Sequence, residues 1–335
     1  MKILLIGLGG FGKHHLRVWR ELGHEVFVSD IDAAKFAMCG TYNIPADHQH
    51  PVWNTFLDRV DAVDVVTQTD AHFDLARACL QAGKDVFVEK PLALSSEQAL
   101  ALLRLNETAQ RIVQVGHIFR FNPAAQYIKM AIANGQLGQI RCLQGFFKGF
   151  KRMRTDVGVT QTDSIHFFDL FNWFLGQRPI AVTAITRDYA GRGLDDLSHT
   201  LLEYDQRIVA HVESGYFDPR TYRHVTIVGE EGAMRSDIVA QRVELFNNRH
   251  VAQQGHVTAV SGGVELPAIT TKEPLELELR AFLESVRTRR APLAGIAEGY
   301  VTLKVTEAAY ASSSRGARVL VQYEDANEFQ TAPHR

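Results

Sequence analysis

Short apolar runs alternate with amphipathic stretches along the first 116 residues of this 335-residue chain. The runs are rich in β-branched residues and nearly continuous in hydrophobicity, as is typical of strands covered on both faces. They occupy residues 2–7, 25–30, 64–69, 85–90 and 111–116. Helical patterns lie between several of them, at 13–22, 72–82 and 96–110. This alternation predicts an α/β fold with a doubly wound parallel sheet of the Rossmann type.

The pattern changes near residues 116–127, where Pro123 is expected to open a helix that runs to about Asn134. Longer strand candidates with turns follow, and they predict an antiparallel sheet. These candidates are 140–150, 181–189, 199–217 and 224–239. Helical patterns return at 273–288 and 298–316. Because 335 residues exceed one ordinary core, we expect two domains, 1–120 and 121–335, the second with C-terminal helices at about 273–316.

The composition indicates a globular chain and excludes several partners. Hydrophobic residues make up 46% and charged residues 22%, and the formal net charge is −2, so neither nucleic acid nor an anionic membrane is an expected partner. The three cysteines are far apart and form no CxxC pair, which favours a reducing cytoplasm over a disulfide framework or zinc ribbon. The opening apolar run breaks into glycines, so we expect no signal peptide, and no run reaches the roughly 20 apolar residues of a membrane span.

Residues 7–12 read GLGGFG and fit the GxGxxG pattern between a predicted strand and a predicted helix. Such glycines permit a tight turn, a close approach of backbone to a pyrophosphate and close helix–strand packing, while the helix N-terminus faces the phosphate charge. Asp30, at the end of the second predicted strand, is expected to bind the adenosine ribose hydroxyls. Its carboxylate would repel a 2′-phosphate, so NAD is the predicted cofactor in preference to NADP. The expected cofactor residues of the loop are Gly7, Leu8, Gly9, Gly10, Phe11 and Gly12.

Two further segments follow predicted parallel strands, whose C-terminal ends border the ligand crevice of an open sheet. The first, TQTDAH, brings Thr67, Thr69 and His72 to this edge, although Thr69 or Asp70 could also cap a helix there. The second reads EKP, and its Pro91 restricts the preceding residue to extended geometry. We expect Glu89 and Lys90 to lie at the same crevice.

An ordered set of motifs resembles the glucose–fructose oxidoreductase and inositol dehydrogenase family. The motifs are GLGGFGKHH (7–15), TQTDAHF (67–73), AGKDVFVEKPLA (82–93), VGHIFRFNPA (115–124), GQLGQI (135–140), HFFDLFNWFLG (166–176) and EPLELELRAFLESV (273–286). The resemblance implies a Rossmann domain, a C-terminal α/β domain with a large open, mainly antiparallel sheet, and a homodimer or homotetramer formed through that sheet. It also implies hydride transfer between a sugar or cyclitol hydroxyl carbon and NAD(P), with Lys90 and His166 as the catalytic lysine and histidine.

Two positions depart from the family pattern. The segment HIFRFNPA is most similar to sugar and nucleotide-sugar dehydrogenases, which usually have glutamate where this chain has Phe119. Many members also have aspartate four residues before the histidine, where this chain has Thr162. Asp163 lies three residues before His166 and is interpreted either as the replacement carboxylate or as the helix N-cap.

The segment 162–176 reads TDSIHFFDLFNWFLG and predicts a helix with an apolar back. Residues three or four apart share a helix face, so Asp163, His166 and Asp169 lie on one stripe with Thr162. A histidine suits removal of a hydroxyl proton, a neighbouring carboxylate can orient it, and a lysine can stabilise the developing alkoxide. We expect Asp163 or Asp169 to serve His166. A divalent metal on this cluster is the main rival, and we expect none because hydride transfer to NAD requires none.

The basic segment FKGFKRMRTD (147–156) precedes this helix. Arginine binds phosphate through its planar fork, so Arg154 is a candidate clamp for a nucleotide-sugar diphosphate, although for any single residue of the segment a solvated basic loop is the favoured interpretation. The sequence therefore predicts an NAD-dependent dehydrogenase of a sugar, most consistent with a nucleotide-linked one. Alternatives are a dehydrogenase or reductase of free sugars or inositols, and an NAD-binding sensor without activity. Lys90, Arg154, Thr162 and His166 are the expected substrate-binding residues.

Overall fold

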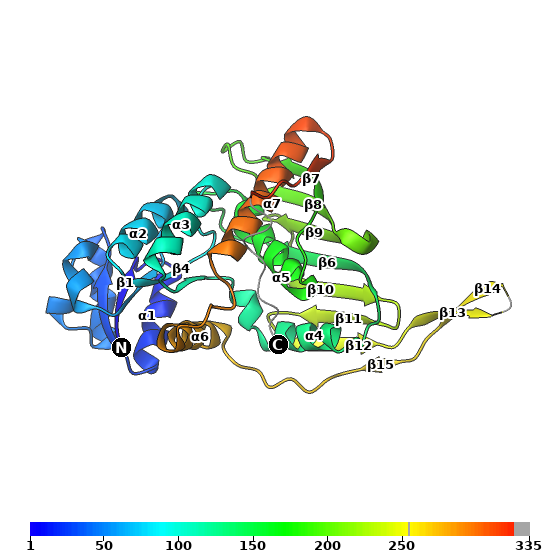
Figure 1. Cartoon of the computed structure of the whole chain (residues 1–335), viewed down its shortest axis with the longest axis horizontal. Helices are drawn as coiled ribbons and strands as arrows, with labels where there is room; N and C mark the ends of the chain where they lie inside the picture. The colour runs from blue at the N-terminus through cyan, green and yellow to red at the C-terminus, as the bar shows by residue number, and fades with distance from the viewer. Residues whose placement is uncertain (254, 325–335) are drawn as a thin grey trace. The chain divides into compact units, whose positions relative to one another are not determined.

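The computed structural model describes residues 1–253 and 255–324, which divide into two compact units (Figure 1). The first unit comprises Met1–Ile118 and Glu273–Leu303. The second comprises Phe119–Lys272 and the described residues from Lys304 onward. Within the described residues, no helix combines the length and the apolar character that a bilayer crossing requires.

The first unit contains a five-stranded parallel sheet with the order β2-β1-β3-β4-β5. Its strands are β1 (Lys2–Ile6), β2 (Glu25–Ser29), β3 (Ala62–Val65), β4 (Asp85–Val88) and β5 (Val113–Val115). Its helices include α1 (Gly12–Glu21), α2 (Thr69–Gln81), α3 (Ser96–Ala109) and α6 (Pro274–Thr288). Three 3-10 helices, Ala33–Tyr42, Ala46–His48 and Trp53–Arg59, connect β2 to β3. The predicted doubly wound parallel sheet is confirmed.

Two local predictions for this unit need correction. Strand β3 begins at Ala62, earlier than the predicted run 64–69, and it ends at Val65 because Thr69 already opens α2. The N-cap of α2 is Gln68 and makes no side-chain cap bond, so neither Thr69 nor Asp70 is the cap.

The segment 273–303 belongs to the first unit, whereas the predicted division assigned it to the second domain. Helix α6 explains the difference, because its apolar face packs into the core of the parallel sheet. Leu275, Leu279 and Phe282 are buried there, and the Phe282 ring lies edge-on to Phe87 of β4 with 5.9 Å between centroids. A chain that leaves this unit near residue 118 therefore returns to complete its core.

The second unit contains a nine-stranded sheet with the order β15-β12-β11-β10-β6-β9-β8-β7-β16. Its strands are β6 (Ile140–Lys148), β7 (Ala181–Arg187), β8 (Leu197–Glu203), β9 (Val209–Gly215), β10 (Tyr222–Gly229), β11 (Ala233–Asp237), β12 (Arg242–Phe246), β15 (Val264–Glu265) and β16 (Val319–Leu320). Strands β13 (Arg249–Gln253) and β14 (His256–Val260) form a separate two-stranded ribbon. All pairs of the large sheet are antiparallel except β6 with β9, so the mainly antiparallel sheet is confirmed.

Helices cover one face of the large sheet and form the core of the second unit with it. They are α4 (Pro123–Ala133), α5 (Ile165–Leu175) and the part of α7 (Ile296–Arg315) that follows Leu303. Pro123 opens α4 as predicted, and the Asn122 side chain caps it by accepting from the Ala124 backbone N–H at 3.0 Å. The opposite face of the sheet carries exposed apolar side chains, Ile185, Leu201 and Val209 among them.

Candidate functional site

The glycine loop of the first unit has the close contacts that its pattern predicts. Gly7 has φ +100°, and a Cβ there would lie 2.5 Å from the carbonyl oxygen of Val66. A Cβ on Gly12 would lie 2.0 Å from the carbonyl oxygen of Gly7, so only glycine lets α1 begin against this turn. Nothing lies within 4 Å of the corresponding position on Gly9. The loop thus leaves its middle open to a ligand at the N-terminus of α1, as a dinucleotide pyrophosphate requires.

Asp30 follows β2 and is buried beside the loop. Its Oδ2 accepts a hydrogen bond from the Leu8 backbone N–H at 2.7 Å, which ties the second strand to the glycine turn. The Lys35 ammonium lies 3.2 Å from the same oxygen. Lys35 was not among the predicted cofactor residues, although its position five residues after Asp30 on a helical turn was a usable signal. Lys35 reduces the negative charge on which the predicted choice between NAD and NADP depends.

A buried charged cluster lies behind the loop and was also missed. His15 of α1 donates through Nδ1 to an Asp64 oxygen of β3 at 2.8 Å, and its Nε2 lies 3.3 Å from Glu89. The Trp19 indole N–H donates to the same Asp64 oxygen at 2.6 Å. Burial alone would lower the pKa of His15, but the two carboxylates prevail and raise that pKa to about 10. The signal available in the sequence was an aspartate inside the apolar strand AVDV.

The segments after β3 and β4 are joined by His72. Its ring lies buried in α2, with Nδ1 2.7 Å from the Pro91 carbonyl oxygen and Nε2 3.2 Å from that of Thr67. Glu89 lies largely buried, and one of its oxygens accepts from the Lys90 backbone N–H at 3.2 Å. The Lys90–Pro91 peptide bond is cis. His72 therefore holds the two loops together from inside the unit, and the half-buried Lys90 follows directly after the sheet edge.

In the second unit, His166 lies in the first turn of α5, which continues a π-helical turn at Thr160–Ser164. Asp163 lies inside this π turn and Ser164 occupies the N-cap of α5 without a side-chain cap bond, so the N-cap interpretation of Asp163 is wrong. The carboxylate that anchors the turn is Asp195, from the β7–β8 connection. It accepts from the Thr160 backbone N–H at 2.8 Å and from the Thr160 hydroxyl at 2.6 Å.

The His166 ring packs against two phenylalanine rings, which also stack on each other with 6.2 Å between their centroids. The Phe119 ring lies 4.6 Å away at 24° and the Phe147 ring 5.3 Å away at 4°. Helix α5 reaches β6 this closely because Gly145 has no side chain: a Cβ there would lie 2.5 Å from the ring of Phe167. His166 is only 7% exposed. The aromatic rings therefore fix the plane of the imidazole.

Each candidate carboxylate contacts a cation. Lys151 Nζ lies 2.6 Å from Asp163 Oδ2, and the Arg120 guanidinium makes two hydrogen bonds to Asp169. Burial lowers the pKa of Lys151, and the attraction of Asp163 partly offsets that effect. Both cations were missed as partners, since Lys151 is twelve and Arg120 forty-nine residues away from its carboxylate.

The basic segment before α5 is largely paired with acidic side chains. Lys148 contacts Glu213, Lys151 contacts Asp163, and Arg154 makes two hydrogen bonds to Asp156. The hydrogen bonds of Asp156 raise the pKa of Arg154. Thr162 is buried, and its backbone N–H donates to the Gly158 carbonyl oxygen at 3.0 Å. Of the predicted substrate residues, Thr162, His166 and Arg154 thus belong to the second unit and Lys90 to the first.

Comparison with known proteins agrees with this arrangement. Residues 1–117 match the model of an oxidoreductase family with an NAD-binding Rossmann fold, and residues 129–321 match the C-terminal α/β domain of the same family. The chain is 31% identical to UDP-N-acetylglucosamine 3-dehydrogenase of Acidithiobacillus ferrooxidans, over 87% of this chain and 90% of the relative. It is 30% identical to inositol 2-dehydrogenase 2 of Saccharopolyspora erythraea, over 70% of this chain and 72% of the relative.

A solved structure of UDP-N-acetylglucosamine 3-dehydrogenase from Acidithiobacillus ferrooxidans has the same fold. It superposes with a TM-score of 0.83 and 22% identity, over 94% of this chain and 98% of that one. The glycine loop and Asp30 fit the dinucleotide of the matched Rossmann domain, and both halves of the family model are present in order. The chain is therefore an oxidoreductase that belongs to the glucose–fructose oxidoreductase, inositol dehydrogenase and MocA family.

Proposed function

We propose that this oxidoreductase oxidises a ring hydroxyl of a nucleotide-linked sugar to a ketone and uses NAD rather than NADP. The observation that carries the proposal is the buried His166 ring, which packs against the Phe119 and Phe147 rings at the start of α5. A buried imidazole with a fixed plane is suited to accept a proton from one defined hydroxyl. The relative named as a nucleotide-sugar dehydrogenase matches most of the chain, which supports this substrate class.

In this proposal, His166 takes the hydroxyl proton while Lys90 donates a hydrogen bond to the same oxygen and stabilises its developing negative charge. Hydride acceptance is the chemistry that NAD supplies when bound. Asp163 forms an ion pair with Lys151 near the Phe147 ring. The Lys151 Nζ lies 4.5 Å from the centroid of that ring. Thr162 and Arg154 are proposed to contact the substrate.

Asp30 supports the preference for NAD. Its carboxylate is fixed by the Leu8 N–H, so it remains at the position where a 2′-phosphate would meet negative charge. Lys35 weakens that repulsion but does not replace the carboxylate as the acceptor for ribose hydroxyls. Thr67, Thr69, Glu89 and His72 are proposed to border the cofactor, with His72 acting through the two loops that it joins.

A smaller polyol substrate is the second candidate, because the side chains of the proposed diphosphate clamp already have acidic partners. Arg154 is held by Asp156, so a diphosphate would have to compete with that carboxylate. The relative named as an inositol dehydrogenase supports the same alternative. A dehydrogenase of free sugars or inositols needs no such clamp.

Reduced-nicotinamide absorbance measured with UDP-N-acetylglucosamine, myo-inositol and glucose separates the candidates. The proposal predicts turnover that is largest with the nucleotide sugar and is lost in Lys90→Met and His166→Asn, with unchanged circular dichroism. His224→Asn is the matched control, since this partly buried histidine on β10 pairs with Asp237 at 3.4 Å and should retain activity. Near-normal turnover in the folded Lys90→Met and His166→Asn variants would contradict the proposed roles of these two residues. Silence with every substrate and either cofactor would favour the sensor without activity.

We also propose a homodimer or homotetramer that buries the face of the large sheet opposite α4 and α5. The exposed Ile185, Leu201 and Val209 on that face support this assembly. Light scattering should report a mass of two or four chains, and Leu201→Glu should reduce it towards one. A cytoplasmic location is proposed because Cys39, Cys79 and Cys142 are all unpaired thiols.

A further inference from the structure

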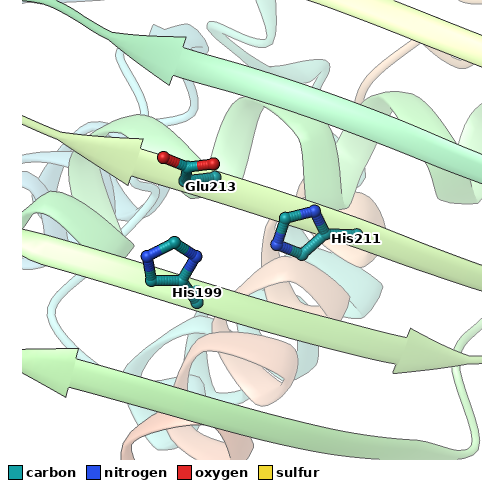
Figure 2. Close-up of side chains that lie close together, drawn as sticks. All are labelled: His199, His211 and Glu213. Carbon is teal, nitrogen blue, oxygen red and sulfur yellow. The ribbon is translucent and has the colours of Figure 1, made fainter. Parts of the chain in front are cut away.

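The face of the large sheet opposite α4 and α5 carries two histidines and a glutamate side by side on neighbouring strands (Figure 2). His199 of β8 is directly opposite Glu213 of β9, and His211 lies two residues before Glu213 on the same strand. Alternate residues of a strand point to the same face, so all three side chains project from one face. Their neighbours Thr200 and Val212 point into the helix-covered core and are buried.

The potential ligand atoms of His199, His211 and Glu213 all lie within 4.8 Å of one another. Within residues 1–253 and 255–324, this is the only group of three or more histidine, cysteine, aspartate or glutamate residues with that spacing. Bonds of about 2.0–2.2 Å to zinc place two ligands of one ion at most about 4.4 Å apart. Small rotations of these partly exposed side chains would therefore close the site.

The identity of the donors selects the class of ion. Two imidazole nitrogens and one carboxylate oxygen suit Zn²⁺ and its first-row neighbours, and three protein ligands leave a fourth position for water. Calcium and magnesium prefer sites made of oxygen atoms. The two imidazole rings already lie nearly parallel, at 8° with 6.0 Å between centroids.

Lys148 of β6 is a cation that competes for the same carboxylate. Its Nζ lies 3.0 Å from Glu213 Oε1 and 3.4 Å from Asp218 Oδ2, and it lies over the Phe146 and Tyr222 rings. If an ion binds Glu213, Lys148 still pairs with Asp218 and still lies over the Phe146 and Tyr222 rings. The ammonium therefore limits the affinity of the site without excluding the ion.

We propose that His199, His211 and Glu213 form a binding site for one first-row transition-metal dication, with Zn²⁺ as the preferred ion. The site joins β8 to β9 on the sheet face opposite α5, the helix that carries His166. This is also the face that is proposed to be buried on assembly, and all three ligands come from one chain. The site is thus separate from the proposed hydride-transfer chemistry, and its test measures metal binding directly.

Equilibrium dialysis of the untagged full chain against Zn²⁺, and the visible spectrum with Co²⁺, measure the site. The expected result is one ion per chain. His199→Asn and His211→Asn should each weaken binding by about tenfold or more, and the double variant should remove it. Glu213→Gln is the nearly isosteric third test and should weaken binding in the same direction. Lys148→Met should tighten binding, because it removes the competing cation.

His224→Asn is again the control, because its pairing with Asp237 lacks a third ligand and the variant should bind Zn²⁺ as the wild type does. Unchanged binding in the His199/His211 double variant would overturn the site. So would a wild-type chain that binds no Zn²⁺ at about a hundredfold excess over protein, or a Lys148→Met variant that binds more weakly than wild type.

Discussion

Both carboxylate oxygens of Asp169 accept hydrogen bonds from Arg120, at 2.8 Å from Nε and 2.7 Å from Nη2. Both side chains are buried, and Asp169 lies one helical turn after His166. A guanidinium that holds a carboxylate through both oxygens fixes it strongly. Asp169 thus joins α5 to the segment that also supplies Phe119, and this pairing favours a structural role for it over service to the histidine.

Asp169→Asn should therefore lower stability more than activity. It leaves a buried guanidinium without its counter-charge, which typically costs about 3–5 kcal/mol, whereas replacing both partners with apolar residues costs far less. Urea unfolding of Asp169→Asn, Arg120→Met and the Arg120→Met/Asp169→Leu double variant should show partial recovery in the double variant. A stable Asp169→Asn protein with greatly reduced kcat would instead identify Asp169 as the carboxylate that serves His166.

Phe119→Glu should move the acidic limb of the pH–rate profile to higher pH. A carboxylate at the position of the Phe119 ring stabilises the protonated form of His166, and a general base works only when unprotonated. The expected displacement is about one pH unit. Phe119→Gln is the control, because it removes the ring without adding charge. Identical profiles for the two variants would contradict the contact between this position and the base.

Asp30→Asn should shift cofactor use towards NADP. The amide keeps an acceptor for the Leu8 N–H but removes the charge that repels a 2′-phosphate, and Lys35 then becomes a net attraction. We expect the ratio of kcat/KM for NADP to that for NAD to rise about tenfold, or about 1.4 kcal/mol. Lys35→Met, measured in parallel, should change the ratio in the opposite direction. An unchanged ratio in Asp30→Asn would show that the carboxylate does not face the ribose.

The stability of the first unit should fall as the pH rises towards 10. The folded pKa of His15 is raised to about 10, above its ordinary value of 6.5, by Asp64 and Glu89 against the effect of burial. A raised pKa contributes stability that is complete below about 6.5 and is lost as the pH rises through the folded value. Urea midpoints between pH 6 and 10.5, in about half-unit steps, measure this loss. The stability of the His15→Asn/Asp64→Asn variant should depend less on pH. If its stability fell equally steeply, groups other than His15 would be the cause of the loss.

The sequence by itself determined the elements of the fold and the positions of the candidate chemistry. Periodicity is a local property, so the strands, most of the helices and the GxGxxG turn could be read from neighbouring residues. Gly7 and Gly12 were predictable because the contacts that require glycine lie within or next to the turn. The location of His166 near the start of a helix followed in the same way.

Only the tertiary structure decided the partners of these residues. Asp163 pairs with Lys151, Asp169 with Arg120, and the π turn before His166 is anchored by Asp195, thirty-five residues from Thr160. Helix α6 likewise completes the core of the first unit from a distant part of the chain. A hydrophobic pattern specifies which face of an element is buried but not which element covers it. Buried charges are therefore paired by packing between distant segments, and no local pattern encodes that choice.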